Sequence, residues 1–130
     1  MIVADASVIL EVLLNTTIGA KVEKQLFAAR QTIHVPHLTD LEVLQVLRRY
    51  SRTSIVSGVR SRQVIEDYRD IPFNRYPHEV LLPRIWELRH NFTPCDAAYI
   101  ALAEALDSPL MTCDRAFAST RGHRAKVIVF

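Results

Sequence analysis

Short apolar runs alternate along the chain with longer segments in which apolar and polar positions recur at helical spacing. The longer segments predict helices at Ser7–Leu14, Ala20–Arg30, Leu38–Tyr50, Val59–Arg69, Glu79–His90 and Thr93 to about Asp107. Pro83 is expected to kink the fifth helix or to lie near its first turn. The short runs predict strands at Met1–Ala4, Thr32–Val35, Ile71–Tyr76, Leu110–Cys113 and Lys126–Phe130.

This order of elements predicts an α/β fold. Short, uninterrupted apolar strands that alternate with helices are typical of a parallel sheet buried on both faces. We therefore expect a three-layer sandwich, with a short parallel sheet of four to five strands flanked by helices. The 130 residues suffice for one domain with its own core, and no linker or repeat divides them, so residues 1–130 are interpreted as a single domain.

The composition excludes several kinds of site. The three glycines are isolated, which rules out both the dinucleotide fingerprint and the phosphate-binding loop that need clustered glycine. The two cysteines form no CxxC motif, so a zinc ribbon is excluded as well. No signal peptide and no apolar stretch of about 18 residues is found. With so few cysteines, a cytoplasmic location is expected.

Acidic residues directly follow two of the predicted strands. Asp5 follows the first strand and Asp114 follows the fourth. Parallel strands bring their carboxyl ends to one edge of the sheet, so both carboxylates are expected there. Each could instead serve only as a helix N-cap or turn residue.

Two further acids are ambiguous when taken singly. Thr93 and Asp96 have the spacing of a capping box, with Pro94 at the first helical position. A carboxylate in that first turn could cap the helix and also face the crevice. Glu42 lies on the polar stripe of the Leu38–Tyr50 helix, a pattern equally typical of a solvated face.

Four segments contain these acids: Ile2-Val3-Ala4-Asp5-Ala6-Ser7-Val8, Leu41-Glu42-Val43-Leu44, Thr93-Pro94-Cys95-Asp96-Ala97-Ala98-Tyr99-Ile100-Ala101-Leu102-Ala103 and Leu110-Met111-Thr112-Cys113-Asp114. In these segments the chain resembles PIN domains, and within them the VapC-type toxins of bacterial toxin–antitoxin pairs. Their order, their spacing and the total length match, so the resemblance covers essentially the whole chain. It implies a PIN-like fold and an endoribonuclease activity.

The resemblance also implies a metal site. Asp5, Glu42, Asp96 and Asp114 would converge on one acidic pocket that holds Mg²⁺ or Mn²⁺. Asp5 and Asp96 are expected to touch the ion directly, and Glu42 and Asp114 partly through water. Oxygen ligands suit these hard cations, whereas the lack of a Cys/His cluster argues against zinc. A divalent ion activates water and neutralises phosphate oxygens, so we expect hydrolysis without a covalent enzyme intermediate.

Four neighbours of these acids need an interpretation of their own. Ser7 and Thr112 lie where the family often has a hydroxyl that lines the pocket, although both could equally be turn residues. Cys95 and Cys113 each precede a site acid, and we expect them to be small, buried core residues.

Arginine dominates the basic residues, with 13 Arg against 3 Lys. Seven of the arginines lie between Arg48 and Arg75 with only three acids, which makes that stretch locally +4. Arginine pairs bidentately with phosphate and stacks on bases, so this stretch is interpreted as an RNA-binding rim, for which Arg48, Arg49 and Arg52 are the candidates. The alternative is a solvated helical face with an arginine bias from codon composition.

Partners follow from the same resemblance. It implies a cognate VapB-type antitoxin, whose tail would lie in a groove among the N-terminal helices and block the pocket, and a homodimer. No membrane partner is expected. The alternative function is a non-catalytic RNA- or protein-binding module on the same fold. A phosphoacceptor receiver domain is disfavoured, because Asp5 has no acidic neighbour and Lys126 begins its strand.

Overall fold

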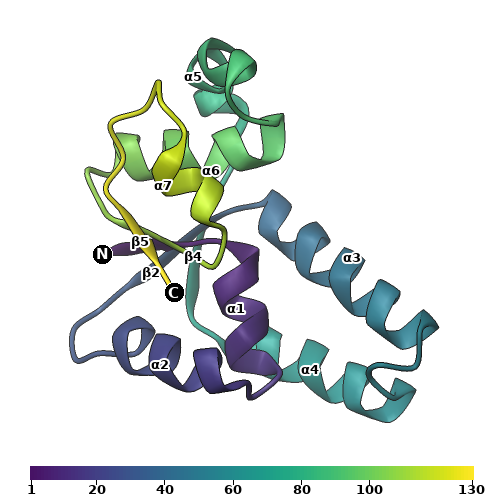
Figure 1. Ribbon diagram of the computed structural model, residues 1–130. Helices are drawn as coiled ribbons and strands as arrows, with labels where there is room; N and C mark the ends of the chain where they lie inside the picture. Colours follow the sequence, from purple (N-terminus) through teal and green to yellow (C-terminus); the bar gives the residue numbers. More distant parts are fainter.

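The computed structural model describes all 130 residues and contains one five-stranded sheet in which every strand pairs in parallel with its neighbours (Figure 1). The strands are β1 (Ile2–Ala4), β2 (Ile33–Pro36), β3 (Phe73–Tyr76), β4 (Leu110–Thr112) and β5 (Val127–Val129), in the order β3-β2-β1-β4-β5. The predicted parallel sheet is confirmed. Pro36 belongs to β2, although the strand was expected to stop before it. Proline has no N–H to donate. It is tolerated at this last position because the hydrogen bond to β3 comes from the next amide, that of His37, which donates to the Tyr76 carbonyl over 2.8 Å.

All six predicted helical segments are helical, and a seventh short helix follows β4. The α-helices are α1 (Ala6–Leu13), α2 (Thr17–Leu26), α3 (Leu38–Arg52), α4 (Gly58–Asp70), α5 (Leu82–Glu87), α6 (Pro94–Ala105) and α7 (Arg115–Ser119). Two 3₁₀ turns, η1 (Glu79–Leu81) and η2 (Leu88–His90), flank α5. None of the helices is long and apolar enough to cross a membrane.

Capping explains where the helices depart from the prediction. The helix α2 begins at Thr17, earlier than expected, because the Thr16 hydroxyl accepts a hydrogen bond from the Gly19 amide at 2.9 Å. Pro83 lies in the first turn of α5, where its missing N–H costs no hydrogen bond. The unpredicted α7 forms behind Asp114, whose side chain accepts from the Ala116 amide at 2.8 Å.

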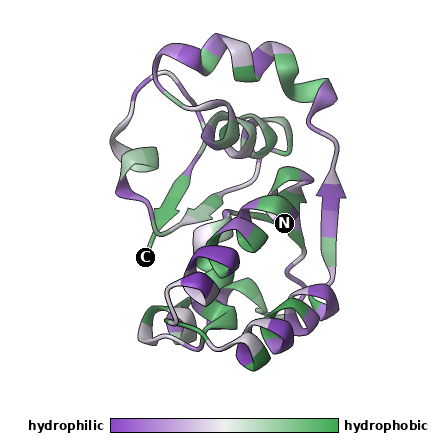
Figure 2. Cartoon of the chain, turned by 90° about the vertical axis from the view of Figure 1, so that its right-hand side faces the viewer, coloured by the Kyte–Doolittle hydropathy of each residue, from purple (hydrophilic) through white to green (hydrophobic).

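Two hydrophobic clusters fill the two faces of the sheet. Ile2 and Ala4 of β1 belong to the cluster that includes buried side chains of α1, α2, α3 and α4, whereas Val3 points to the cluster around α6. Leu110, in register beside Val3, joins the same cluster as Val3. Burial on both faces explains why β1 and the first two residues of β4, Leu110 and Met111, are apolar. The edge strand β3 departs from this pattern, with exposed Asn74 and Arg75 at its centre, and is largely hydrophilic in Figure 2.

The carboxyl ends of the five parallel strands meet at one edge, which we call the carboxyl edge. Asp5 directly follows β1, and Asp114 follows β4 after one intervening residue. The helix α3, which carries Glu42, leaves the end of β2 at the same edge. The topology therefore places these three predicted site residues on one side of the sheet.

Candidate functional site

Asp5 is held between β1 and β4 by two hydroxyl groups. Only 8% of its surface is exposed. Its Oδ2 accepts hydrogen bonds from Ser7 Oγ and Thr112 Oγ1, each at 2.7 Å. Both hydroxyl oxygens in turn accept a backbone N–H at 3.0 Å, Ser7 from Cys113 and Thr112 from Asp114. Because their own acceptor sites are used, the two hydroxyls are oriented to donate to the carboxylate, which is more than a turn residue would do.

The environment of Asp5 disfavours its negative charge. Burial raises the pKa of Asp5, and the charge of Asp96 raises it further. The hydrogen bonds from Ser7 and Thr112 oppose this rise because they stabilise the ionised form. Asp5 takes part in no ion pair. Its carboxylate therefore carries a charge that no protein cation compensates.

Glu42 is held by a buried tyrosine from another helix. Tyr99 of α6, 1% exposed, donates a hydrogen bond from its hydroxyl to Glu42 Oε2 at 2.6 Å. The same hydroxyl bonds to Thr39 Oγ1 at 2.9 Å. Burial raises the pKa of Glu42, the Tyr99 hydrogen bond lowers it, and the charges of Asp5 and Asp96 raise it. Tyr99 ties α6 to α3.

Sequence reasoning missed Tyr99 as a residue of the site. It lies three positions after Asp96 and so on the same face of the helix as that acid. A phenol hydroxyl within an otherwise apolar run of Ala, Ile and Leu needs a hydrogen-bond partner. That requirement was the available signal, but the sequence does not say which partner it finds.

Thr93 caps α6, with Asp96 in the first turn of that helix, and Asp114 caps α7. The Thr93 hydroxyl accepts from the Asp96 amide at 3.2 Å and donates to Asp96 Oδ2 at 2.7 Å, with Pro94 in the first turn of α6. The predicted Thr93–Asp96 cap is confirmed. Asp114 is exposed and caps α7 through the Ala116 amide. The capping alternative holds for Asp114, whereas the Asp96 carboxylate accepts from the Thr93 hydroxyl, and one carboxylate oxygen of each acid has no protein partner.

The structure brings three of the four predicted acids under each other's influence. The charges of Asp5 and Asp96 raise the pKa of Glu42, and that of Asp96 raises the pKa of Asp5. Asp114 lies outside this electrostatic group and is linked to Asp5 through the Thr112 hydroxyl. No three His, Cys, Asp or Glu side chains lie close enough together to form a complete metal site. The four-acid metal site therefore stays a prediction.

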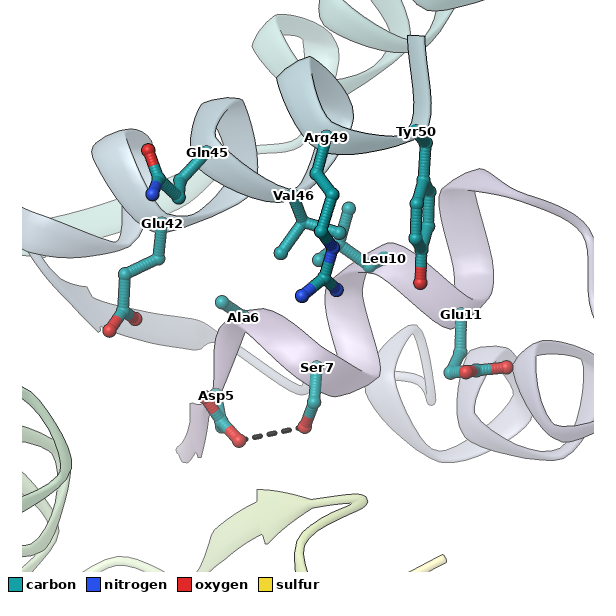
Figure 3. A pocket seen from close by; sticks show the side chains of 10 residues that line it. All are labelled: Asp5, Ala6, Ser7, Leu10, Glu11, Glu42, Gln45, Val46, Arg49 and Tyr50. Carbon is teal, nitrogen blue, oxygen red and sulfur yellow. Dashed lines mark hydrogen bonds between the residues drawn. The ribbon is translucent and has the colours of Figure 1, made fainter. Parts of the chain in front are cut away.

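Asp5 and Glu42 face one pocket between α1 and α3, with a volume of about 410 Å³ (Figure 3). We call it the acidic pocket; Asp96 and Asp114 are not among the residues that line it. In Figure 3, Asp5 and Ser7 lie on the α1 side, while Glu42, Gln45 and Arg49 descend from α3. This arrangement places a guanidinium group in the same pocket as three carboxylates, those of Asp5, Glu11 and Glu42.

The three arginines predicted to form the RNA-binding rim form no ion pairs, unlike two other arginines of the same stretch. Arg75 pairs with Asp40 at 3.1 Å, and Arg60 donates to the Leu13 carbonyl at 2.7 Å, so both brace the fold. Arg48, Arg49 and Arg52 form no ion pair. All three line a second hollow of about 400 Å³ that shares Arg49 with the acidic pocket.

The two cysteines have different environments. Cys113 is half-buried and packs against the cluster around α1, close to its expected core role. The expectation for Cys95 was wrong: it is exposed, in the first turn of α6. Partial burial and the charges of Glu42 and Asp96 raise the pKa of the Cys95 thiol. It is therefore a protonated thiol and not a soft metal ligand.

The donor groups at the carboxyl edge fit a hard divalent cation. They are carboxylate and hydroxyl oxygens, and burial raises the pKa of both Asp5 and Glu42, with a smaller contribution from neighbouring carboxylates. Asp5 Oδ1 accepts no hydrogen bond from a protein side chain. Because no complete set of ligands is assembled, side chains would have to rotate toward the ion as it binds.

A parallel sheet between helical layers, with acids at its carboxyl edge, defines a three-layer α/β protein with a candidate site at that edge. The family profile described as "PIN domain" matches residues 2–122. The chain belongs to the PIN-domain family, and within it to the VapC type.

Two curated relatives and one solved structure illustrate this similarity. The chain is 41% identical over 120 residues to "VapC ribonuclease Mb0985" of Mycobacterium bovis, covering 92% of this chain and 91% of the relative. It is 36% identical over 127 residues to "Ribonuclease VapC12" of Mycobacterium tuberculosis, covering 98% and 97%. The fold is similar to a chain of a "Toxin-antitoxin complex from Klebsiella pneumoniae", with a TM-score of 0.67, 19% identity and coverage of 99% and 97%.

Proposed function

We propose that this protein is the toxin of a type II toxin–antitoxin pair and cleaves RNA as a Mg²⁺- or Mn²⁺-dependent endoribonuclease. The observation that carries the proposal is the buried Asp5 carboxylate, held by two hydroxyls beside Glu42 and Asp96 with no compensating cation. The relatives named ribonucleases, similar over nearly the whole chain, support the same activity.

Each residue of the site would have its own role in metal binding and catalysis. Asp5 and Asp96 would hold the ion directly, with Glu42 and Asp114 completing its shell partly through water. The bound ion would lower the pKa of the attacking water and offset charge on the phosphate. Ser7 and Thr112 hold Asp5 in one orientation, and Tyr99 does the same for Glu42. Fixed carboxylates reduce the reorganisation that the reaction requires.

We further propose a VapB-type antitoxin as the protein partner. A hollow of about 650 Å³ adjoins the acidic pocket and shares Glu11 and Tyr50 with it. Its lining includes Leu14, Ile55 and Val56, and Ile55 is 68% exposed. An apolar groove that runs into the acidic pocket suits a tail that blocks the site. The similar Klebsiella structure is a toxin–antitoxin complex, which supports this kind of partner.

A homodimer is proposed as well. The segment around α5 exposes three large apolar side chains, those of Val80, Leu82 and Trp86. Exposed apolar groups gathered on one segment are typical of an interaction surface. Sedimentation at several concentrations tests this proposal, and a wild-type protein that stays monomeric throughout would contradict it.

The activity is tested with structured RNA in three reactions: protein with Mg²⁺, protein with EDTA, and Asp96→Asn with Mg²⁺. We expect cleavage only in the first. Asp107→Asn is a matched control, because Asp107 is exposed, and its φ of 45° is one that asparagine tolerates. Equal cleavage in all reactions would point to a contaminating nuclease. RNA binding without cleavage in any of them would instead identify a non-catalytic binding module.

A further inference from the structure

Arg49 occupies an unusual position for a cation. It lines the same pocket as Asp5 and Glu42, and its guanidinium points from α3 into the space between α3 and α1 (Figure 3). Yet it lies beyond ion-pair distance of every carboxylate. Its Cζ lies 5.4 Å from the centroid of the Tyr50 ring, within the range of a cation–π contact. The group is thus directed into the pocket without being neutralised there.

The sequence of α3 places Arg49 in line with the acidic site. Glu42, Gln45 and Arg49 follow one another at intervals of three and four residues and so share a face of the helix. Arg52, three residues further on, continues this line. Along one helix face the surface therefore changes from a carboxylate to successive guanidinium groups.

The second hollow continues the same path. Arg48, Arg49 and Arg52 line it together with Gln45, Thr53 and a single apolar residue, Val46. A hollow lined by three guanidinium groups without ion pairs, with Val46 as its one apolar residue, is suited to a chain of anions.

We propose that Arg49 binds the RNA phosphate at the acidic site and that Arg48 and Arg52 bind the phosphates next along the strand. RNA would then leave the site along the C-terminal half of α3. The proposal rests on the ribonuclease activity proposed above and adds the course of the substrate. An acidic antitoxin segment is the other possible occupant. The three guanidinium groups and the single apolar residue, Val46, favour RNA, because a protein segment needs pockets for apolar anchors to bind stably.

The test measures binding separately from cleavage. A fluorescent single-stranded RNA oligonucleotide is titrated with protein in EDTA, and anisotropy is followed at several salt concentrations. The variants are Arg49→Gln, Arg49→Lys, Arg48→Gln and Arg52→Gln. Arg69→Gln is the matched control, because it removes the same charge from an exposed position without an ion pair. Arg69 lies near the end of α4, just before β3, and so at the edge of the sheet opposite the acids.

We expect Arg49→Gln to weaken RNA binding about tenfold, the loss of one charge-assisted hydrogen-bonding group. The salt dependence of log K should become shallower by about 0.7, as for one lost phosphate contact on a single strand. Arg48→Gln and Arg52→Gln should show smaller losses in the same direction. Arg49→Lys should lie between wild type and Arg49→Gln, because lysine keeps the charge and loses the planar fork. Arg69→Gln should bind as wild type does.

Other outcomes would overturn the inference. If Arg49→Gln binds RNA no more weakly than Arg69→Gln, Arg49 does not bind the substrate, even where the wild type cleaves RNA. If Arg49→Gln keeps RNA binding but loses binding of an antitoxin, the guanidinium serves the protein partner. If the wild type binds RNA through Arg49 without cleaving it, the inference stands and the proposed catalysis fails. Unchanged melting temperatures would show that the variants are folded.

Discussion

The Tyr99 hydroxyl donates a 2.6 Å hydrogen bond to Glu42 Oε2 and thereby joins α6 to α3 at the carboxyl edge. The bond links an almost fully buried side chain to a half-buried carboxylate. It holds Glu42 in place against the repulsion from Asp5 and Asp96. Tyr99 does not line the pocket that Asp5 and Glu42 face, so its contact with that pocket is through Glu42.

Tyr99→Phe should lower the rate of RNA cleavage about tenfold, as expected for the loss of a hydrogen bond to a charged group. The bond lowers the pKa of Glu42, so its loss raises that pKa. The acid limb of the pH–rate profile should therefore move to higher pH. Thr39→Val is the control, because it removes the other partner of Tyr99 and spares Glu42. An unmoved pH profile in Tyr99→Phe would exclude the positioning role.

Asp5→Asn should stabilise the protein in EDTA at pH 7. In Mg²⁺ it should abolish RNA cleavage. The folded-state pKa of Asp5 is raised. Its protonated form is therefore favoured in the folded state, and stability falls as the pH rises from about 4, the ordinary value, through the raised pKa. Asparagine carries no charge and can still accept both hydroxyl hydrogen bonds. A gain of about 1 kcal/mol would raise Tm by about 4 °C. Melts between pH 4 and pH 8 check this, and the two proteins should converge toward pH 4. A variant that melts below wild type at pH 7 would refute the prediction.

Mg²⁺ should raise the melting temperature of the wild type. An ion that binds only the folded state stabilises it by about 2.7 kcal/mol at a concentration 100 times its Kd. It would also compensate the buried charges of Asp5 and Glu42, whose pKa values are raised mainly by burial and further by neighbouring carboxylates. Thermal melts across a Mg²⁺ titration provide the measurement, with Asp5→Asn expected to respond weakly. Wild-type curves that coincide at every concentration would argue against a divalent ion at this site.

Gly19→Ala should destabilise the protein by about 3 kcal/mol, in the range known for overpacked cores. A Cβ at this position would clash with the backbone carbonyl of Glu11, because α1 and α2 approach closely there. Backbone cannot move aside as a flexible side chain can. Gly58→Ala is the matched control. Its Cβ would meet nothing within 4 Å, and the change should be neutral or stabilise by about 0.4–1 kcal/mol. Equal urea midpoints for the two variants would contradict the close-packing interpretation.

The sequence predicted the layers and the order of elements well, because each strand is short, apolar and buried on both faces. Residues whose structure is set locally were also predictable, as the Thr93–Asp96 cap shows. The start of α2, the inclusion of Pro36 in β2 and the short helix α7 were not predicted. Each depends on a single cap or ladder hydrogen bond that carries little weight in a periodicity argument.

The candidate site was predicted less completely. The motifs identified the four acids, but the structure bonds the Asp96 carboxylate to the Thr93 hydroxyl, uses Asp114 as a helix cap and assembles no complete set of metal ligands. Ser7 and Thr112 were ambiguous because a hydroxyl in a turn and one that holds a carboxylate look the same in sequence. The Cys95 prediction failed because Cys95 lies in the exposed first turn of α6, and the buried part of that helix begins only at Ala97.

By itself the sequence determined the parallel α/β fold, the family and the identity of the acids, since these depend on hydrophobic periodicity and on local motifs. Only the tertiary structure decided which side chains meet. Ser7 and Thr112 lie 105 positions apart and converge on Asp5, while Tyr99 reaches Glu42 across 57 positions. The tertiary structure also gave two arginines different roles: Arg49 is directed into the pocket, whereas Arg75 pairs with Asp40 and braces the fold. Such pairings depend on how parallel strands bring distant segments to one edge, and no local pattern encodes that proximity.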